Sequence, residues 1–219
     1  MHSTVKNLLD IEINIKNYLG KNINENLPKI IAVSKTFKID KILPLVDHGH
    51  CDFGENKVQE AVDKWTEIKK TNLHVKLHMI GKLQTNKVKY AVRIFDYIHS
   101  VDSTKLAKKI ADEQKKVNKK IKVFLQINIG DEDQKSGNNK TEVNQLVAYC
   151  KEVGLDLIGL MCIPPANFDP SNYFEEMNGL NKSLGFGDLS MGMSSDYLIA
   201  AKHFATYVRI GSSIFGQRN

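Results

Sequence analysis

The chain has 219 residues, of which 42% are apolar and 26% are charged, and it contains only 5 prolines. This composition is typical of a globular protein with one sizeable core and argues against a disordered chain. The 31 lysines and arginines outnumber the 25 acidic residues, and the net charge of +6 suits phosphorylated ligands or nucleic acid without selecting either. We expect a single domain over residues 1–219, because one α/β barrel takes about 200 to 250 residues.

Residues 1–20 predict an amphipathic helix that packs on the outside of the main fold. Its apolar side chains recur at spacings of three and four and end at Gly20; they are Val5, Leu8, Ile11, Ile15, Tyr18 and Leu19. Charged and amide residues interrupt this run, and no apolar stretch of about 18 residues is present anywhere. We therefore expect neither a signal peptide nor a membrane segment.

Beyond this helix, short apolar runs alternate with longer helical patterns. The predicted strands cover residues 30–33, 51–53, 75–80, 95–98, 121–127, 155–160, 188–191 and 207–210. The predicted helices include residues 55–70, 103–118, 141–153 and 171–184. Continuous apolar strands of this kind are expected where helices cover both faces of a parallel sheet.

Eight strand and helix units favour a closed (β/α)8 TIM barrel over residues 29–217. An open, doubly wound α/β sheet is the alternative. The closed barrel is preferred because no G-x-G-x-x-G motif follows the first predicted strand.

In such a barrel the chemistry lies where strands end and loops begin. Lys35 directly follows the first predicted strand, so its amine would point into the barrel mouth. Apolar neighbours and other cations disfavour the charged form of a lysine, and the neutral amine can form a Schiff base with an aldehyde. The alternative is a lysine whose amine simply reaches solvent.

The last two predicted strands end in glycine and hydroxyl residues. Gly211 and Ser212 follow strand 207–210 and open a short helix, whose N–H groups and dipole favour an anion such as phosphate. Ser194 follows strand 188–191 and can donate to the same phosphate or cap a helix. An ordinary N-cap serine is the alternative for Ser212, and Arg209 at the strand end favours the anion site.

Seven motifs in chain order carry a family resemblance. They are residues 32–36 (AVSKT), 53–60 (FGENKVQE), 78–81 (HMIG) with Gln84, Asn86 and Lys87, 135–137 (KSG), 159–161 (GLM), 189–194 (LSMGMS) and 209–216 (RIGSSIFG). With these motifs, residues 31–217 resemble the pyridoxal 5'-phosphate homeostasis proteins, the YggS/PROSC family. The resemblance implies a single barrel of pyridoxal phosphate (PLP) fold type III, similar to the N-terminal domain of alanine racemase.

The resemblance also implies roles for individual residues. Lys35 matches the lysine that forms the Schiff base with the cofactor, and Asn56 matches a residue near the cofactor ring. Arg209 matches the arginine beside the pyridine nitrogen, where a cation disfavours protonation and weakens the ring as an electron sink. The phosphate-binding positions are matched by Ser194, Gly211 and Ser212. The chain departs from the family at Leu77, where an aromatic residue is usual, and at Cys162, where alanine is usual.

Three functions are consistent with these residues. The family resemblance implies a protein that carries or buffers PLP on Lys35 without robust turnover. A PLP-dependent amino-acid racemase is the alternative, but racemases of this fold add a second domain that supplies the other base, and two-base proton transfer needs both. A Schiff-base aldolase acting on a sugar phosphate is the third, and it would be colourless.

Other residue clusters predict no further site. His48, His50 and Cys51 lack further ligands at a familiar spacing, so we expect no metal site. His78 either lines the cofactor pocket or is a hydrogen-bonded structural residue. The lysine-rich stretch 105–122 is interrupted by acids and lacks stacking aromatics, which favours a solvated helix over nucleic-acid binding.

The remaining expectations concern the compartment and the partners. The three cysteines, Cys51, Cys150 and Cys162, are far apart and form no C-x-x-C pair, which favours reduced thiols and a cytoplasmic protein. The expected partners are PLP and PLP-dependent apo-enzymes, whose identity the sequence leaves open. We expect a monomer, since the racemase dimer depends on the missing domain.

Overall fold

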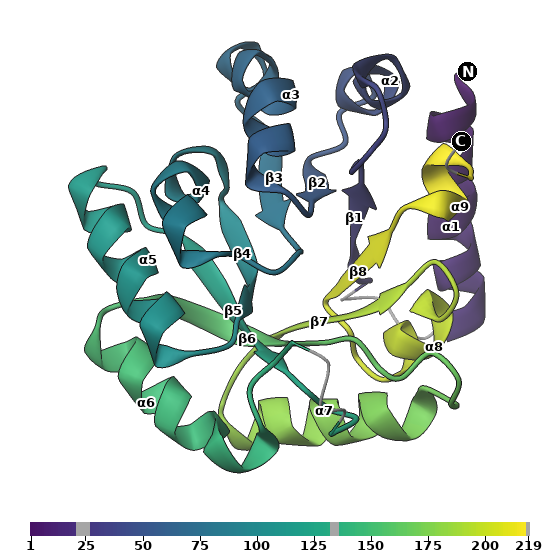
Figure 1. The fold of residues 1–219 in the computed structure, drawn as a ribbon. Coiled ribbons are helices and arrows are strands. Elements are labelled where there is room, and N and C mark those ends of the chain that lie inside the picture. The colour runs from purple at the N-terminus through teal and green to yellow at the C-terminus, as the bar shows by residue number, and fades with distance from the viewer. Residues whose placement is uncertain (21–26, 132–135, 218–219) are drawn as a thin grey trace.

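The computed structural model describes residues 1–20, 27–131 and 136–217. Within these residues the strands form a closed parallel barrel, in which each strand pairs with the next along the chain and β8 pairs with β1. Helices form a ring around the strands (Figure 1). The predicted closed (β/α)8 barrel is confirmed, and the open doubly wound sheet is wrong. Lys135 of the 135–137 motif lies outside the described residues.

The strands lie close to the predicted runs. They are β1 (Lys29–Val33), β2 (Asp52–Glu55), β3 (Lys76–Met79), β4 (Tyr97–Val101), β5 (Lys122–Ile127), β6 (Asp156–Cys162), β7 (Asp188–Met193) and β8 (Tyr207–Ile210). The largest shift is at β4, which starts after the predicted Phe95. Phe95 is fully buried in the connection before the strand, so the apolar run marks burial there and not strand pairing.

The helices include several that the sequence pattern does not single out. The longer helices are α1 (Ser3–Leu19), α2 (Ile39–Asp47), α3 (Val58–Thr71), α4 (Val88–Ile94), α5 (Thr104–Lys116), α6 (Val143–Glu152) and α7 (Ser171–Ser183). The short ones are η1 (Thr85–Lys87), η2 (Lys140–Glu142), α8 (Tyr197–Lys202) and α9 (Ser212–Phe215). Helix α3 starts at Val58, not at the predicted residue 55, because Glu55 ends β2 with its side chain buried.

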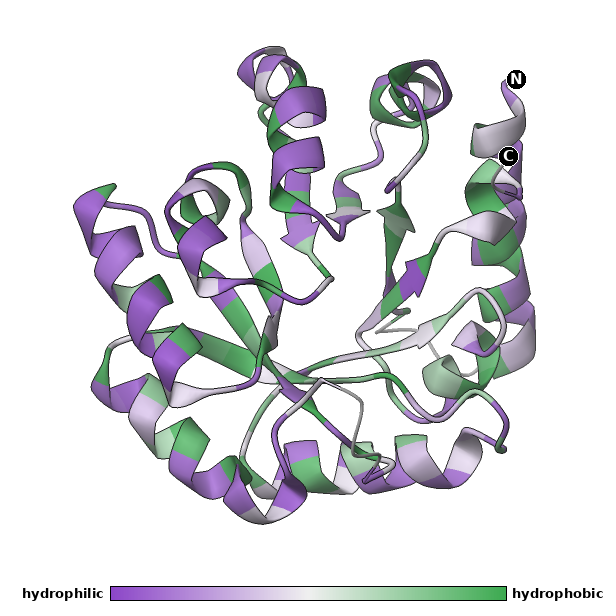
Figure 2. Cartoon of the chain, in the orientation of Figure 1, coloured by the Kyte–Doolittle hydropathy of each residue, from purple (hydrophilic) through white to green (hydrophobic). Residues whose placement is uncertain are grey.

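Two groups of apolar side chains hold the barrel together. The larger group lies between the strands and the surrounding helices, whose outer surfaces are mostly hydrophilic (Figure 2). The smaller group fills the interior of the barrel and consists of Ile31, Tyr97, Phe124, Met161 and Tyr207. A filled interior leaves the ends of the strands as the place for a site.

Helix α1 packs on the outside of the barrel beside α8 and α9, as predicted (Figure 1). It buries Leu8, Ile11 and Ile15, and the Nδ2 atom of Asn7 donates a hydrogen bond to the carbonyl of Ile214 at 2.9 Å. The N-terminal helix is thereby tied to the segment that follows β8. In the part of the chain that the structure describes, none of the helices combines the length and apolar character needed to cross a bilayer.

Candidate functional site

A cavity of about 920 Å³ opens at the carboxyl ends of the strands. It is lined by all of the residues that the sequence predicts for the site, which are Lys35, Asn56, Ser194, Arg209, Gly211 and Ser212. They come from loops after β1, β2, β7 and β8 and from β8 itself. The volume falls in the range of about 300 to 1,000 Å³ that small-molecule sites occupy.

Several lining residues are absent from the predicted set. They are polar or small side chains of the neighbouring loops and strands, and include Gly81, Lys82, Gln126, Asn128, Ser136 and Ser195. Gly81 and Ser136 belong to motifs of the family resemblance, which is the one signal that points to them. The others are common residue types whose position in the wall depends on closure of the barrel.

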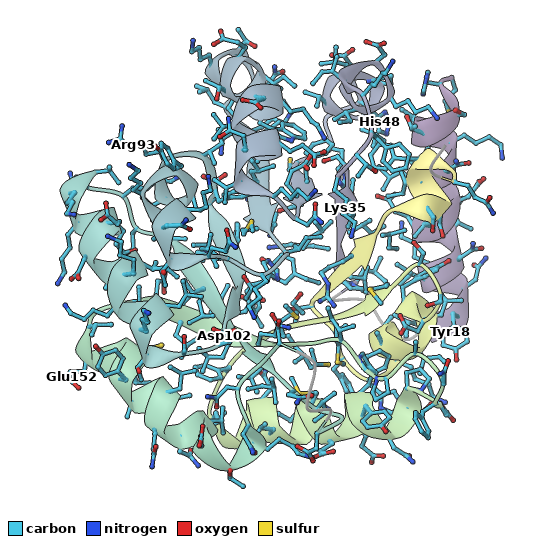
Figure 3. All side chains as sticks on the ribbon, viewed as in Figure 1. Tyr18, Lys35, His48, Arg93, Asp102 and Glu152 are labelled. Carbon is cyan, nitrogen blue, oxygen red and sulfur yellow. The ribbon has the colours of Figure 1, made fainter. Side chains whose placement is uncertain are left out.

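Lys35 lies inside the ring of helices, just beyond the end of β1 (Figure 3). Its two neighbours are both held by carboxylates. The Oγ atom of Ser34 donates to Oε1 of Glu55 at 2.7 Å, and the backbone N–H of Thr36 donates to Oε1 of Glu60 at 2.5 Å. Thr36 has a φ of 67°, which is unusual for a β-branched residue. The loop that carries Lys35 is therefore fixed on both sides.

A single lysine joins the two carboxylates. The Nζ atom of Lys64 lies 3.0 Å from Oε1 of Glu55 and 3.0 Å from Oε1 of Glu60, and it donates to the carbonyl of Ser34 at 2.9 Å. The indole of Trp65 adds a further hydrogen bond to Glu55 Oε1 at 3.0 Å. Because Glu55 is fully buried, these donors compensate its Oε1, whereas its Oε2 is buried without a hydrogen-bond partner among the described residues.

Arg209 lies within strand β8 and lines the cavity. Its Nη1 donates to the Oγ of Ser190 at 2.7 Å, and its Nη2 donates to the carbonyl of Cys162 at 2.9 Å. Burial lowers the pKa of the guanidinium from its ordinary value, although arginine stays charged in proteins. Two of the five N–H groups are thus fixed, which orients the remaining ones.

The loops after β7 and β8 are bonded to each other. The N–H of Gly211 donates to the Oγ of Ser194 at 3.2 Å, which leaves the hydroxyl hydrogen of Ser194 able to donate to an anion. Gly192 precedes this loop with a φ of +90°, and a Cβ there would lie 2.5 Å from the Cβ of Ala200. Only glycine fits that position, so the turn that places Ser194 is tightly specified.

The side-chain oxygen of Asn56 is a hydrogen-bond acceptor that receives no hydrogen bond from the described residues. Its Oδ1 atom is buried and has no hydrogen-bond partner among the described residues. The backbone of Asn56 packs against Gly81, where a Cβ would lie 2.5 Å from its carbonyl oxygen. A buried polar atom of this kind costs free energy unless a bound group supplies a hydrogen bond.

Two residues that the sequence singles out lie outside the cavity wall. His78 is fully buried inside the barrel and bonds to Asp52 and His99, so it is the hydrogen-bonded residue of the two predicted alternatives. Cys162 is also buried, and burial raises the pKa of its thiol to about 12. It contacts the site through its backbone carbonyl, which accepts from Arg209.

A second cavity, of about 1060 Å³, lies at the opposite end of the barrel. Residues at the amino ends of strands line it, among them Lys29, Asp188 and Thr206. None of the predicted site residues contributes to it. In barrels of this type, that end serves stability rather than chemistry, so we assign the site to the smaller cavity.

Comparisons with known proteins place the chain among relatives. Residues 7–219 match the family model described as "Alanine racemase, N-terminal domain". The chain is 37% identical over 214 residues to the pyridoxal phosphate homeostasis protein of Haemophilus influenzae, covering 91% of this chain and 89% of that protein. It is 38% identical over 202 residues to the protein of the same name from Escherichia coli K12, covering 87% and 86%.

Solved structures agree with the barrel. PipY of Synechococcus elongatus without PLP has a TM-score of 0.87 and 28% identity, and the alignment covers 98% of this chain and 100% of PipY. PipY with PLP bound has a TM-score of 0.81 and 29% identity, and the alignment covers 97% of this chain and 100% of PipY. An alanine racemase of Clostridium difficile has a TM-score of 0.74 at 18% identity, and 57% of its chain is covered. At this sequence identity, the similarity to the alanine racemase shows a shared fold alone.

Proposed function

Because the chain belongs to the family of pyridoxal phosphate homeostasis proteins, we propose that it binds pyridoxal 5'-phosphate at the cavity lined by Lys35 and buffers the free cofactor. The observation that carries the proposal is the convergence of Lys35, Arg209 and the serine-bearing loops after β7 and β8 on a single cavity. PipY, a structural relative that matches nearly the whole chain, has been solved with PLP bound.

The residues of the cavity fit this cofactor. PLP carries an aldehyde, an anionic phosphate and a ring with a hydrogen-bonding nitrogen and oxygen, and it supplies the electron sink when bound. The orphaned Oδ1 of Asn56 is a buried acceptor that a bound group can satisfy. Arg209 supplies oriented N–H donors, and the hydroxyl of Ser194, held by the N–H of Gly211, supplies another donor. An aldehyde, a ring and an anion each find a partner of suitable chemistry.

Each residue has a distinct role in the proposal. Lys35 holds the cofactor covalently as a Schiff base, formed by its Nζ with loss of water. Ser194 and Ser212 bind the phosphate through hydroxyl and N–H donors, and Gly211 has no side chain and lets the backbone approach the phosphate closely. Asn56 contacts the ring, and Arg209 faces the ring nitrogen as a cation that keeps this nitrogen unprotonated.

We further propose that the chain has no robust catalytic turnover. Among the described residues that line the cavity, the ionisable side chains are Lys35, Lys82 and Arg209. A racemase needs a second group that exchanges protons on the opposite face of the substrate carbon. Arginine does not deprotonate at neutral pH, which leaves Lys82 as the one candidate among them. An amino-acid racemase is the second candidate function.

Reductive trapping tests the cofactor site. Borohydride reduction of PLP-loaded protein, followed by peptide mass spectrometry, is expected to find the pyridoxyl group on Lys35. Lys35→Ala is expected to lose the label, and Lys82→Ala, in the same cavity wall, is expected to keep it. Label on Lys82 in the native chain, or no label at all, contradicts the assignment.

A racemase assay tests the absence of turnover. Purified PLP-loaded protein is expected to racemise alanine far below ordinary enzyme rates, and about one turnover per second or more would contradict the proposal.

We also propose a cytoplasmic monomer that passes PLP to apo-enzymes. Its three free cysteines suit a reducing compartment. Size-exclusion chromatography with light scattering tests the monomer.

A further inference from the structure

Five polar side chains form a continuous hydrogen-bonded line through the interior of the barrel. Arg209 Nη1 lies 2.7 Å from Ser190 Oγ, and Ser190 Oγ lies 2.9 Å from Nδ1 of His99. His99 Nε2 lies 2.9 Å from Nδ1 of His78, and His78 Nε2 lies 2.9 Å from Oδ1 of Asp52. These residues belong to five different strands. The line connects the cavity to the first residue of β2, at the opposite end of that strand.

Aromatic rings enclose the middle of the line. The ring of His78 stacks on Tyr97 at a centroid distance of 4.2 Å, and the ring of His99 stacks on Phe124 at 4.3 Å. Both histidines are fully buried. Their planes are therefore fixed by packing, and their ring nitrogens bond to each other, to Ser190 and to Asp52.

The charge of Arg209 gives the line a direction. A guanidinium can only donate, so Ser190 accepts from Arg209 and its own hydrogen is free to donate to Nδ1 of His99. His99 then donates from Nε2 to Nδ1 of His78, and His78 donates from Nε2 to the carboxylate of Asp52. In this arrangement both histidines are neutral, with hydrogen on Nε2. Arginine does not give up its proton, so the line orients groups and does not conduct protons.

Titratable groups around the line favour these protonation states. Burial lowers the pKa of His78, against the opposing bond to Asp52, and lowers that of His99 far more, with help from His78 and Arg209. Burial alone would raise the pKa of Asp52, but its bond from His78 and the nearby charges of His50 and Lys76 lower it. Besides Asp52, the charges that act on the pKa of His78 are those of Asp96 and Lys76. The groups that raise the pKa of Arg209, against burial, are Cys162 and Asp196.

Arg209 lacks a carboxylate in direct contact. Within residues 1–20, 27–131 and 136–217 it makes no ion pair, although its side chain is almost fully buried. A buried cation is costly unless it is compensated. The hydrogen-bonded line ends on Asp52, an anion whose side chain is 14% exposed at the other end of the barrel.

We propose that Asp52 is the distant counter-charge of Arg209, and that Ser190, His99 and His78 are positioning residues that fix the guanidinium toward the cavity. The hydrogen-bonded line itself is independent of the cofactor. Its effect on the ring nitrogen rests on the proposed function. Hydrogen-bonded chains polarise each other in a low-dielectric interior, so the loss of one member is expected to act at the far end.

Histidine tautomers test the line in the cofactor-free protein. Long-range ¹H–¹⁵N correlation NMR at neutral pH is expected to show His78 and His99 as neutral rings with hydrogen on Nε2. Ser190→Ala is expected to change the Nδ1 shift of His99, and Asp52→Asn that of Nε2 in His78. Ser100→Ala is the matched control, because the Oγ of Ser100 is buried next to His99 without a partner among the described residues. A doubly protonated ring, or hydrogen on Nδ1 of His99, overturns the proposal.

The absorbance of PLP-loaded protein tests the effect on the site. With Asp52→Asn or Ser190→Ala, the cation at Arg209 is less compensated, and the protonated form of the bound cofactor is disfavoured. The absorbance of the bound cofactor changes with pH, and the midpoint of this change is therefore expected to move down by about half a pH unit or more. Ser100→Ala is expected to show no shift. If the midpoint is unchanged in both Asp52→Asn and Ser190→Ala, Asp52 is not the counter-charge of Arg209.

The two proposals fail in different ways. If mass spectrometry finds no pyridoxyl group on Lys35 while the histidine tautomers are as expected, the proposed function fails and the hydrogen-bonded line stands. If Lys35 is labelled but the tautomers differ, the cofactor site stands and the counter-charge proposal is wrong.

Discussion

The Oγ of Ser34 donates a hydrogen bond to the Oε1 of Glu55 at 2.7 Å, directly before Lys35 in the chain. This contact joins the carboxyl ends of β1 and β2 behind the proposed Schiff-base lysine. Lys64 donates to the same carboxylate oxygen and to the Ser34 carbonyl, so a buried ion pair supports the loop. The precision with which Lys35 is placed therefore depends on residues that do not line the cavity.

Glu55→Gln is expected to destabilise the fold and slow cofactor capture. The change leaves Lys64, whose side chain is 11% exposed, with the weakly buried Glu60 as its remaining carboxylate. Removing one charge of a buried pair costs about 3 kcal/mol. Urea unfolding measures the stability, and stopped-flow absorbance measures capture of PLP. Glu67→Gln is the control, since its pair with Lys70 is exposed. Equal stability of the two variants would show that the buried pair is unimportant.

Ser194→Ala and Ser212→Ala are each expected to weaken PLP retention roughly tenfold, because a hydrogen bond to a charged group contributes about 1.5 to 3 kcal/mol. Both residues line the cavity, whereas the exposed neighbour Ser213 does not and serves as the control. Labelling of Lys35 by reduction at saturating PLP is expected to persist in all three. Equilibrium dialysis gives the dissociation constants, and unchanged values would count against the phosphate assignment.

Gly192→Ala is expected to destabilise the protein by about 2 kcal/mol or more. The residue has a φ of +90°, and the new Cβ would lie 2.5 Å from that of Ala200. Gly187→Ala is the control, because nothing lies within 4 Å of a Cβ at that position. Thermal unfolding compares the two variants. A stability loss of the same size in both would mean that the turn before Ser194 is not strained by a side chain.

Acid is expected to destabilise the fold below about pH 6.5 through the buried histidines. Burial holds the pKa of His78 and of His99 below the unfolded value of 6.5, so at lower pH the unfolded chain binds protons that the folded chain does not. Stability therefore rises with pH across this window, by up to about 1.4 kcal/mol per pH unit for each group.

Urea midpoints between pH 5 and pH 7.5 measure this slope. Burial lowers the pKa of His50 as well, so His99→Gln removes one of three such groups and is expected to flatten the curve in part. His74→Gln, at an exposed position, is expected to leave the slope unchanged. A slope that is the same in the native chain and in His99→Gln would exclude His99 as a source of the acid sensitivity.

Much of the fold follows from local sequence. The apolar runs that become β1 and β5 are buried on both faces, so their hydrophobic pattern alone predicts central parallel strands. The helix over residues 1–20 has an apolar stripe and a terminal glycine. Helix α2 is less visible, because it is short and contains Pro44, which local rules associate with a helix break.

The amino-acid sequence by itself determined the barrel and its N-terminal helix, since apolar periodicity is a local property. Residues at strand ends pointed to Lys35, Ser194, Arg209, Gly211 and Ser212, and the family resemblance added Asn56. Tertiary structure decided the roles of Asp52, His78, His99 and Ser190. These residues are far apart along the chain and carry no shared motif, and only closure of the parallel strands brings their side chains within hydrogen-bonding distance inside the barrel.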